Sequence, residues 1–324
     1  MTSEVSPVPN DADPPRVVID ESTFDFRRLS PDQLSALLDR FNDELTELKA
    51  MGCPAWKPPM FENASCHDEH ELYDYLTSEP GSGVDRDVRN RFYSLIQKCP
   101  EWDASAPTCD EVALGDGPPI TAWSVAYALT STLRGQGVAC LVLASSRHRS
   151  FVTATTLAEE AQLYFFADNS KLPPFWRFLY ELENVPEGKF FELTVRAFPK
   201  LIFHEDLTFK RFEGSYRDLR SQIVRQLADL NDHFLAAHTA ALGRANEVNA
   251  ILMSRGSTRV SPESPKTHQN AKAMRERYVW HEGREVCCEW HSKIEGHRNR
   301  IHFAFGDEFG DRILIGIFVD HLTT

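Results

Sequence analysis

Apolar residues recur along this chain at two spacings, one helical and one extended. Residues 120–133 are apolar on most sides and predict a buried helix. A second helix is expected to begin at 30–33, where serine can cap, proline suits the first turn and glutamine completes a capping box. Two stripes at three- and four-residue intervals predict amphipathic helices: Leu34, Leu37, Phe41, Leu45 and Leu48, and later Leu219, Ile223, Leu227, Leu230 and Phe234.

Short apolar runs lie between these helices and predict strands. They occupy 138–143, 151–155 and 163–166, and the segments 190–195 and 201–203 are also expected to be extended. Residues 16–254 therefore predict a mixed α/β domain. A tail with four prolines precedes it at 1–15 and is expected to be disordered. A Ser-Arg-Gly-Ser break at 254–257 places the predicted domain boundary after residue 254.

The last sixty-odd residues have the most informative pattern. The segments 280–293, 297–303 and 313–321 read as three strands joined by short turns. Side chains of a strand alternate between its faces, so His291 and Lys293 share one face. On the next strand Ile301 would face a core, leaving Arg300 and His302 outward. We expect a small sheet with one apolar face and one outward face of imidazoles and cations, which suits phosphate-bearing ligands.

The charge of the chain is unevenly distributed. The whole chain has a net charge of −13, which argues against a nucleic-acid coat over the entire surface. Residues 255–302, however, hold ten Lys or Arg against six Glu, a net +4, together with five His. The remainder of the chain therefore has −17. Such asymmetry indicates a nucleic-acid-facing module, with an ordinary solvated basic surface as the alternative.

The cysteines and the apolar segments indicate the cellular compartment of the protein. The seven cysteines show no repeated spacing and no Cys-x-x-Cys pair, so reduced thiols are expected rather than disulfides. No stretch approaches the roughly 20 apolar residues that span a bilayer. The first residues lack the basic and apolar regions of a signal peptide. We expect a cytoplasmic protein that does not bind membranes.

The basic segment begins with a helix start at 261–267. Ser264 is a good N-cap and Pro265 a good first helical residue, so Lys266 and Thr267 could hold a phosphate at the helix N-terminus. An ordinary capped helix packing on the sheet is the alternative. The predicted nucleic-acid contacts of the segment are Lys266, Thr267, Lys272, Arg275, Arg277 and His297.

The histidines and cations of the sheet are candidates for acid–base chemistry. RNA cleavage without metal needs a base for the 2′-hydroxyl, a cation for the phosphate oxygens and an acid for the leaving oxygen. Glu289 or Asp320 could orient an imidazole. The candidate catalytic residues are His291, Lys293, Arg298, Arg300, His302 and His321, with His297 as a further imidazole. Outward residues of an exposed sheet without any catalytic role are the alternative.

A metal site is a second interpretation of the same residues. His291, His302, His321 and a carboxylate are suitable ligands for zinc or another divalent ion, although their spacing is not diagnostic. The Cys66-His67 pair with His70 could likewise bind a metal. The chain contains no glycine-rich phosphate loop, no Gly-x-Ser-x-Gly elbow and no dinucleotide fingerprint.

Two motifs stand out in the C-terminal segment: Arg-Asn-Arg-Ile-His-Phe at 298–303 and Ile-Gly-Ile-Phe-Val-Asp-His at 315–321. In these motifs the segment resembles the RelE/HigB class of bacterial toxins. The resemblance implies one or two helices followed by a small antiparallel sheet, and RNA cleavage by basic residues without metal. Arg300 would contact phosphate, and Lys293, His302 and His321 would act as acid, base or charge-stabilising groups. The chain departs from the family in lacking its lysine-rich C-terminal end.

Together these features predict an α+β fold, with a mixed α/β domain at 16–254 and a helix-plus-antiparallel-sheet domain at 255–324. The leading hypothesis is a bacterial toxin-like or phage-defence effector whose C-terminal module binds RNA without a metal or other cofactor. Whether that module also cleaves RNA, as an endoribonuclease, is left open by the sequence. The N-terminal domain would be a sensor, an inhibitor of the basic face or a docking site for a protein partner. Two alternatives remain: a non-catalytic nucleic-acid-binding or regulatory protein, and a metal-dependent hydrolase that uses the C-terminal histidines.

Overall fold

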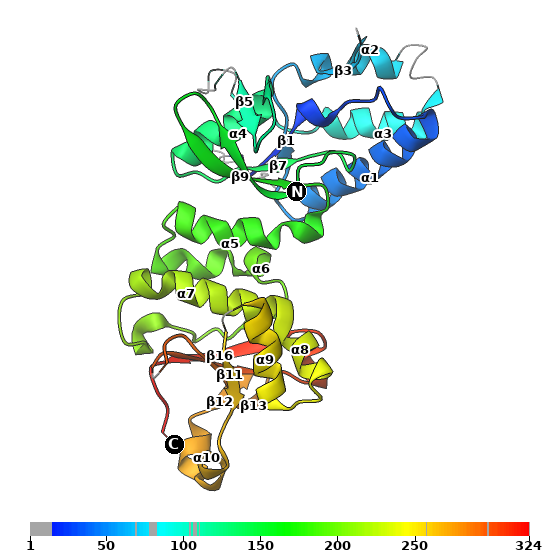
Figure 1. The fold of residues 1–324 in the computed structure, drawn as a ribbon. Coiled ribbons are helices and arrows are strands. Elements are labelled where there is room, and N and C mark those ends of the chain that lie inside the picture. The colour runs from blue at the N-terminus through cyan, green and yellow to red at the C-terminus, as the bar shows by residue number, and fades with distance from the viewer. Residues whose placement is uncertain are drawn as a thin grey trace, which may run out of the picture. The chain divides into compact units, whose positions relative to one another are not determined.

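The chain folds into two compact units, Met1–Leu172 and Pro173–Thr324, in a computed structural model (Figure 1). The structure describes residues 15–68, 70–77, 83–103, 105, 109, 111–256, 258–296 and 298–323. The predicted tail at 1–15 lies outside these residues apart from its last position. Among the described residues, no helix is both long and apolar enough to cross a bilayer.

Unit 1 is built around a mixed seven-stranded sheet of order β2-β1-β7-β9-β8-β5-β6. Its parallel half contains β1 (Val17–Ile19), β2 (Ala55–Trp56), β7 (Ala139–Leu141) and β9 (Glu160–Phe166). Its antiparallel half adds β8 (Ser150–Thr155), β5 (Val112–Leu114) and β6 (Pro119–Ile120). A separate short pair is formed by β3 (Ser65–His67) and β4 (His70–Glu71).

The helices of unit 1 are α1 (Pro31–Ala50), α2 (Leu72–Thr77), α3 (Arg86–Ile96) and α4 (Trp123–Leu133). Two of them, α1 and α4, follow from the predicted patterns. The capping box is present, since Ser30 Oγ accepts from the Gln33 amide and the Gln33 side chain accepts from the Ser30 amide. The buried stripe of α1 uses Leu38, whereas Leu37 is half-buried. Most of α4 is buried, as its continuous apolar sequence predicts.

Two acidic residues are buried where β1 ends. Asp20 accepts hydrogen bonds from the amide and hydroxyl of Ser22, at 3.1 and 2.6 Å. Both carboxylate oxygens of Glu21 lie 3.3 Å from the amide of Ser124, in the first turn of α4. Burial raises the pKa of Asp20 to about 6, and burial together with the nearby Asp20 charge raises the pKa of Glu21 to about 7. These carboxyl groups therefore titrate near neutral pH.

Unit 2 contains a five-stranded sheet of order β10-β16-β15-β14-β11. Its strands are β10 (Leu201–Phe203), β16 (Ile313–Val319), β15 (Arg300–Ala304), β14 (Trp290–Lys293) and β11 (Val260–Pro262). β10 runs parallel to β16, and the other neighbours are antiparallel. A separate hairpin is formed by β12 (Tyr278–His281) and β13 (Arg284–Cys287).

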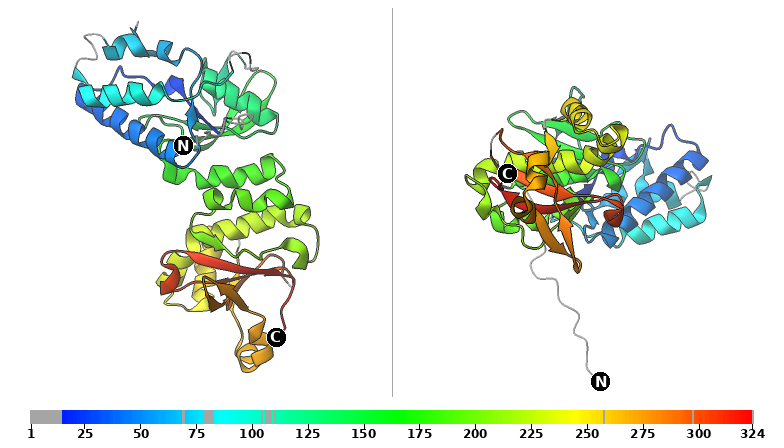
Figure 2. Two further views of the ribbon diagram at one scale, coloured as in Figure 1. Left: turned by 180° about the vertical axis from the view of Figure 1, so that it is seen from behind. Right: turned by 90° about the horizontal axis from the view of Figure 1, so that it is seen from below.

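The helices of unit 2 lie mainly on one side of this sheet (Figures 1 and 2). They are α5 (Pro173–Leu182), α6 (Thr194–Ala197), α7 (Tyr216–Asp229), α8 (Leu235–Ala240), α9 (Ala245–Arg255), α10 (Pro265–Gln269) and α11 (Ala271–Arg275). A π-helical segment, Leu230–Phe234, joins α7 to α8. The Phe234 ring contacts Phe303 of the sheet, with ring centroids 4.8 Å apart. The apolar stripe predicted at 219–234 therefore faces this side of the sheet.

The opposite side of the sheet is covered by residues 263–288, here called the cover segment. This segment includes α10, α11 and the β12–β13 hairpin. Its Val286 and Cys288 pack against Ala304 and Leu314 of the sheet. Gly316 is an extra residue of β16, because His302 pairs with Ile317 and Phe303 pairs with Ile315. A side chain at Gly316 would overlap the Cys288 sulfur, so glycine permits this close approach.

The α+β class and the C-terminal sheet are confirmed, but the division of the chain differs from the prediction. The two units meet after Leu172, whereas the predicted boundary followed residue 254. The physical reason is that β10 is a strand of the C-terminal sheet and that α7 packs on the same sheet through Gln226, whose amide donates to the Lys293 carbonyl at 2.6 Å. The segment 190–195, expected to be extended, is largely helical, because it lies within the 3-10 helix Glu187–Glu192 and α6 (Thr194–Ala197). The segment 280–293, predicted as one strand, is divided among β12, β13 and β14.

Candidate functional site

Two cross-strand pairs place the predicted histidines and cations on one face of the sheet. His291 of β14 lies opposite His302 of β15, and Lys293 lies opposite Arg300. Directly opposite residues of an antiparallel pair project on the same side. The predicted alternation is therefore confirmed, and we call this side of the sheet the histidine face.

The histidine face was predicted to point outward, and this prediction is wrong for His291 and His302. The cover segment lies over one end of this face, leaving His302 1% and His291 7% exposed. Lys293 and Arg300, at the other end, are half-buried. The face thus has a closed end with two imidazoles and a more open end with two cations.

The closed end contains an ion pair that the cover segment contributes. Glu263 directly follows β11, and Arg277 directly precedes β12. Arg277 Nε lies 2.8 Å from Glu263 Oε1, and both side chains are buried. Arg277 Nη1 donates to the Ala273 carbonyl at 2.5 Å. Arg277 was predicted to contact nucleic acid, and its burial in this pair removes it from that role.

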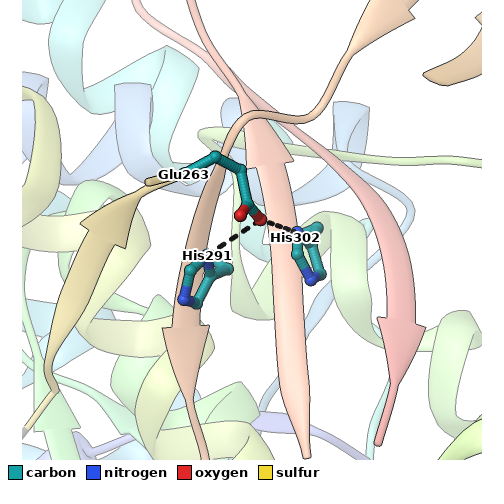
Figure 3. Close-up of side chains that lie close together, drawn as sticks. All are labelled: Glu263, His291 and His302. Carbon is teal, nitrogen blue, oxygen red and sulfur yellow. Dashed lines mark ion pairs between the residues drawn. The ribbon is translucent and has the colours of Figure 1, made fainter. Parts of the chain in front are cut away.

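The two imidazoles converge on the same carboxylate oxygen (Figure 3). Glu263 Oε1 lies 3.5 Å from His291 Nδ1 and 3.8 Å from His302 Nδ1. The centroids of the two rings are 5.1 Å apart. The hydroxyl of Ser261, opposite His291 on β11, lies 3.1 Å from His291 Nε2. Glu263, His291 and His302 form the candidate site, here called the buried triad.

The shifted pKa values of the buried triad give its members different charges. Burial raises the pKa of Glu263, but His291 and Arg277 outweigh that effect and lower it to about 2. Burial lowers the pKa of His291, and it lowers the pKa of His302 to about 3 with the nearby His291 as a further cause. The lowered pKa values favour neutral imidazoles beside an ionised carboxylate. Neutral, covered imidazoles are poorly suited to protonate a leaving group on a bound RNA.

The open end adjoins a pocket of about 560 Å³ at the β11 edge of the sheet. Arg225 comes from α7, Arg259 directly precedes β11, and Lys293 ends β14. Among the described residues that line it, none is acidic. The lining consists of Gln222, Arg225, Gln226, Asn249, Arg259, Val260, Ser261, Lys293, Ile294 and Gly296.

The remaining predicted catalytic residues are dispersed. Arg298 is exposed and pairs with Glu213 at 2.7 Å and with Glu295, so its charge is already neutralised. His321 is exposed two residues beyond β16, and its Nδ1 lies 2.5 Å from the Leu322 carbonyl oxygen. His297 lies outside the described residues.

The predicted phosphate-binding helix start is a capped single turn. The Ser264 hydroxyl accepts from the Thr267 amide at 3.1 Å, and Thr267 is buried. Lys266 and Lys272 are exposed, whereas the exposed Arg275 pairs with Glu285. The capped-helix alternative therefore describes this segment better than a phosphate site does.

Sequence reasoning missed Glu263, Arg225 and Arg259 as site residues. The expected orienting acids lie elsewhere, since Glu289 pairs with His268 at 3.0 Å and Asp320 accepts from the Asn299 amide at 3.3 Å. The sequence contained one signal for Glu263, which is an acidic residue directly after a short strand of the C-terminal sheet. The register that brings it to the histidines is not encoded locally.

The composition of the buried triad suits a metal ion. Its ligand atoms all lie within 4.8 Å of one another, and no second cluster of this kind occurs among the described residues. The earlier candidate around Cys66, His67 and His70 is not among the clusters that meet this distance. Comparison of the chain with protein-family models, with curated proteins and with solved structures finds no match.

Proposed function

We propose that unit 2 binds single-stranded RNA through the pocket beside the open end of the histidine face. The observation that carries the proposal is the lining of that pocket, in which Arg225, Arg259 and Lys293 occur without an acidic neighbour among the described residues. Arginine and lysine supply most phosphate contacts in nucleic-acid complexes. The resemblance of 298–321 to RNA-cleaving toxins points to the same ligand class.

The cations of the pocket are available to a ligand. No carboxylate of a described residue lies within ion-pairing distance of Arg225, Arg259 or Lys293, in contrast to the doubly paired Arg298. Arg225 and Arg259 are exposed. The side chains of Gln226 and Asn249 are engaged by backbone groups, which fixes the wall behind the cations. A phosphate there would replace water without breaking an internal ion pair.

RNA binding should depend on salt through these three cations. Each phosphate contact to a single strand contributes roughly 0.7 to the slope of log affinity against log salt. We expect the variant Arg225→Ala/Arg259→Ala/Lys293→Ala to bind a fluorescent single-stranded RNA more weakly and to reduce the slope by about 2. Fluorescence anisotropy of the full-length protein at several salt concentrations measures both quantities.

A matched control is available on the same unit. Arg244 is exposed and pairs with Glu247 at 2.9 Å, and it does not line the pocket. Arg244→Ala should leave affinity and salt slope unchanged. Equal RNA binding by the triple variant and the wild type would exclude the pocket as the RNA site.

Metal-independent cleavage is the catalytic extension of this proposal. Lys293 and Arg300 lie opposite each other, Arg300 pairs with Val319, and His321 follows Val319 by two residues. These three groups therefore belong to the same end of the sheet and could supply two cations and an exposed imidazole. His321 replaces the covered histidines as the candidate for proton transfer.

Cleavage is tested with full-length protein and total RNA, with and without EDTA and with ribosomes added. EDTA-resistant cleavage that His321→Ala abolishes while RNA binding persists would support a ribonuclease. Binding without cleavage under all of these conditions would leave the non-catalytic RNA-binding function. The fragment 255–324 is unsuitable for this test because it lacks β10 and α7, which complete the sheet and its packing.

A further inference from the structure

We propose that the buried triad binds a divalent transition-metal ion of the Zn²⁺ class. Two imidazoles and one carboxylate are the ligands that Zn²⁺ and similar borderline ions prefer. The Oε1–Nδ1 distances of 3.5 and 3.8 Å approach the separation of about 3.3 Å expected between ligands at the corners of a zinc tetrahedron. None of the three ligands lines the RNA pocket, although Ser261, which contacts His291, does. Metal retention and RNA binding are measured separately, so either proposal can fail without the other.

The three ligand atoms lack hydrogen-bond partners. Glu263 Oε1, His291 Nδ1 and His302 Nδ1 are buried and form no hydrogen bond with a described residue. Arg277 Nε lies 2.8 Å from Oε1, yet its N–H direction does not make a hydrogen bond. Buried polar atoms are nearly always satisfied in folded proteins. A metal ion would accept the lone pairs of all three atoms at once.

Ser261 orients one of the imidazoles for this role. Its hydroxyl lies 3.1 Å from His291 Nε2, so the imidazole can donate its proton there. When an ion occupies the site, that tautomer leaves the Nδ1 lone pair free to bind it beside Glu263. Metal-binding histidines commonly donate their second nitrogen to a neighbouring acceptor, which fixes the ring and its tautomer. Ser261 is therefore a positioning residue for the proposed ligand.

Arg277 determines the net charge of the site once an ion is bound. Because Glu263 is already balanced by Arg277, a divalent ion with two neutral imidazoles leaves two uncompensated positive charges in a buried site. An anionic further ligand such as hydroxide reduces this excess. The site is covered and draws its ligands from β14, β15 and the residue after β11, so its ion would hold the start of the cover segment onto the sheet.

The test measures retained metal without reference to RNA. Full-length protein is stripped with EDTA, loaded with Zn²⁺ or Co²⁺ and freed of excess ion by gel filtration. We expect a single equivalent of retained metal by mass spectrometry, a raised melting temperature and visible absorption bands for the Co²⁺ form. His291→Ala and Glu263→Gln should lose the retained ion and the absorption. His268→Ala removes an exposed imidazole that pairs with Glu289 and should change neither.

A conservative variant protects the test against unfolding. Far-UV circular dichroism identifies variants that fail to fold, and Ser261→Ala perturbs the site without removing a ligand. Loss of such an outer contact typically weakens metal binding 10- to 100-fold, and we expect a change of that order for Ser261→Ala. The proposal is overturned when the wild type retains no ion, or when folded His291→Ala and Glu263→Gln proteins retain as much as the wild type.

Discussion

Buried carboxylates occur in both units, and they show opposite protonation behaviour. In unit 1 the pKa values of Asp20 and Glu21 are raised to about 6 and about 7, mainly by burial. In unit 2 burial acts on Glu263 in the same direction, but His291 and Arg277 reverse the result and lower its pKa to about 2. Burial alone therefore does not set the charge of an interior acid, because the groups that face the acid can reverse the effect of burial.

The two environments also serve different structural purposes. Asp20 accepts a hydrogen bond from a backbone amide of the 3-10 helix Glu21–Thr23, and Glu21 accepts one at the start of α4. A neutral acid can still accept both. Glu263 faces a buried guanidinium, which needs an anion because arginine stays protonated in proteins. Replacing Arg277 in unit 2 should therefore change the stability of the protein much more than replacing Asp20 or Glu21 in unit 1.

The largest expected effect is that of Arg277→Met. This change leaves Glu263 buried without its counter-ion, and breaking a buried ion pair on one side typically destabilises by about 3–5 kcal/mol. Urea denaturation of the full-length protein at pH 7 should show this loss in the transition of unit 2. The double variant Glu263→Gln/Arg277→Met should recover part of it because no unpaired charge remains. A single variant as stable as the wild type would contradict the comparison.

A smaller, pH-dependent effect is expected in unit 1. The folded state binds protons at Asp20 and Glu21 more tightly than the unfolded state, whose acids titrate near 3.8 and 4.5. Their stabilising contribution is therefore fully present below about pH 4 and is lost as pH rises through about 6 to 7. Unit 1 should be more stable at pH 5 than at pH 8.

Glu21→Gln tests this directly. A glutamine carbonyl can still accept from the Ser124 amide, but it removes the buried charge. We expect a gain on the order of 2 kcal/mol at pH 8 and almost none at pH 4.5, measured by urea denaturation. Glu159→Gln, on an exposed turn, is the control and should leave the pH dependence intact. An unchanged pH dependence in Glu21→Gln would show that Glu21 is already ionised without penalty.

The alternation of side chains on the histidine face could be predicted because it is a local property of a strand. His291 with Lys293, and Arg300 with His302, need only the period of two. Their burial could not be predicted in the same way. It depends on the cover segment folding back over the sheet, and on Gly316 permitting the approach of Cys288.

Long-range pairing limited the prediction of the fold and of the buried triad in the same way. β10 joins the sheet from about a hundred residues upstream of β16, so the predicted boundary at 254 separated two parts of one unit. Glu263 reaches the histidines through the β11–β14 register, which pairs Pro262 with Trp290. Neither pairing leaves a signature in the local apolar pattern, whereas α1 and α4 are visible in their own sequences.

The smallest expected effect comes from a fourth carboxylate, which faces an imidazole at the surface of unit 2. Glu289 Oε1 lies 3.0 Å from His268 Nε2, closer than Glu263 lies to His291, but its side chain is 42% exposed. Solvent screens such pairs, and their contribution is typically below about 1 kcal/mol. We expect Glu289→Gln to shift the urea midpoint of unit 2 far less than Glu263→Gln does, and any shift to diminish with added salt. Equal destabilisation by the two changes would mean that contact with an imidazole, rather than burial opposite Arg277, makes Glu263 important to the fold.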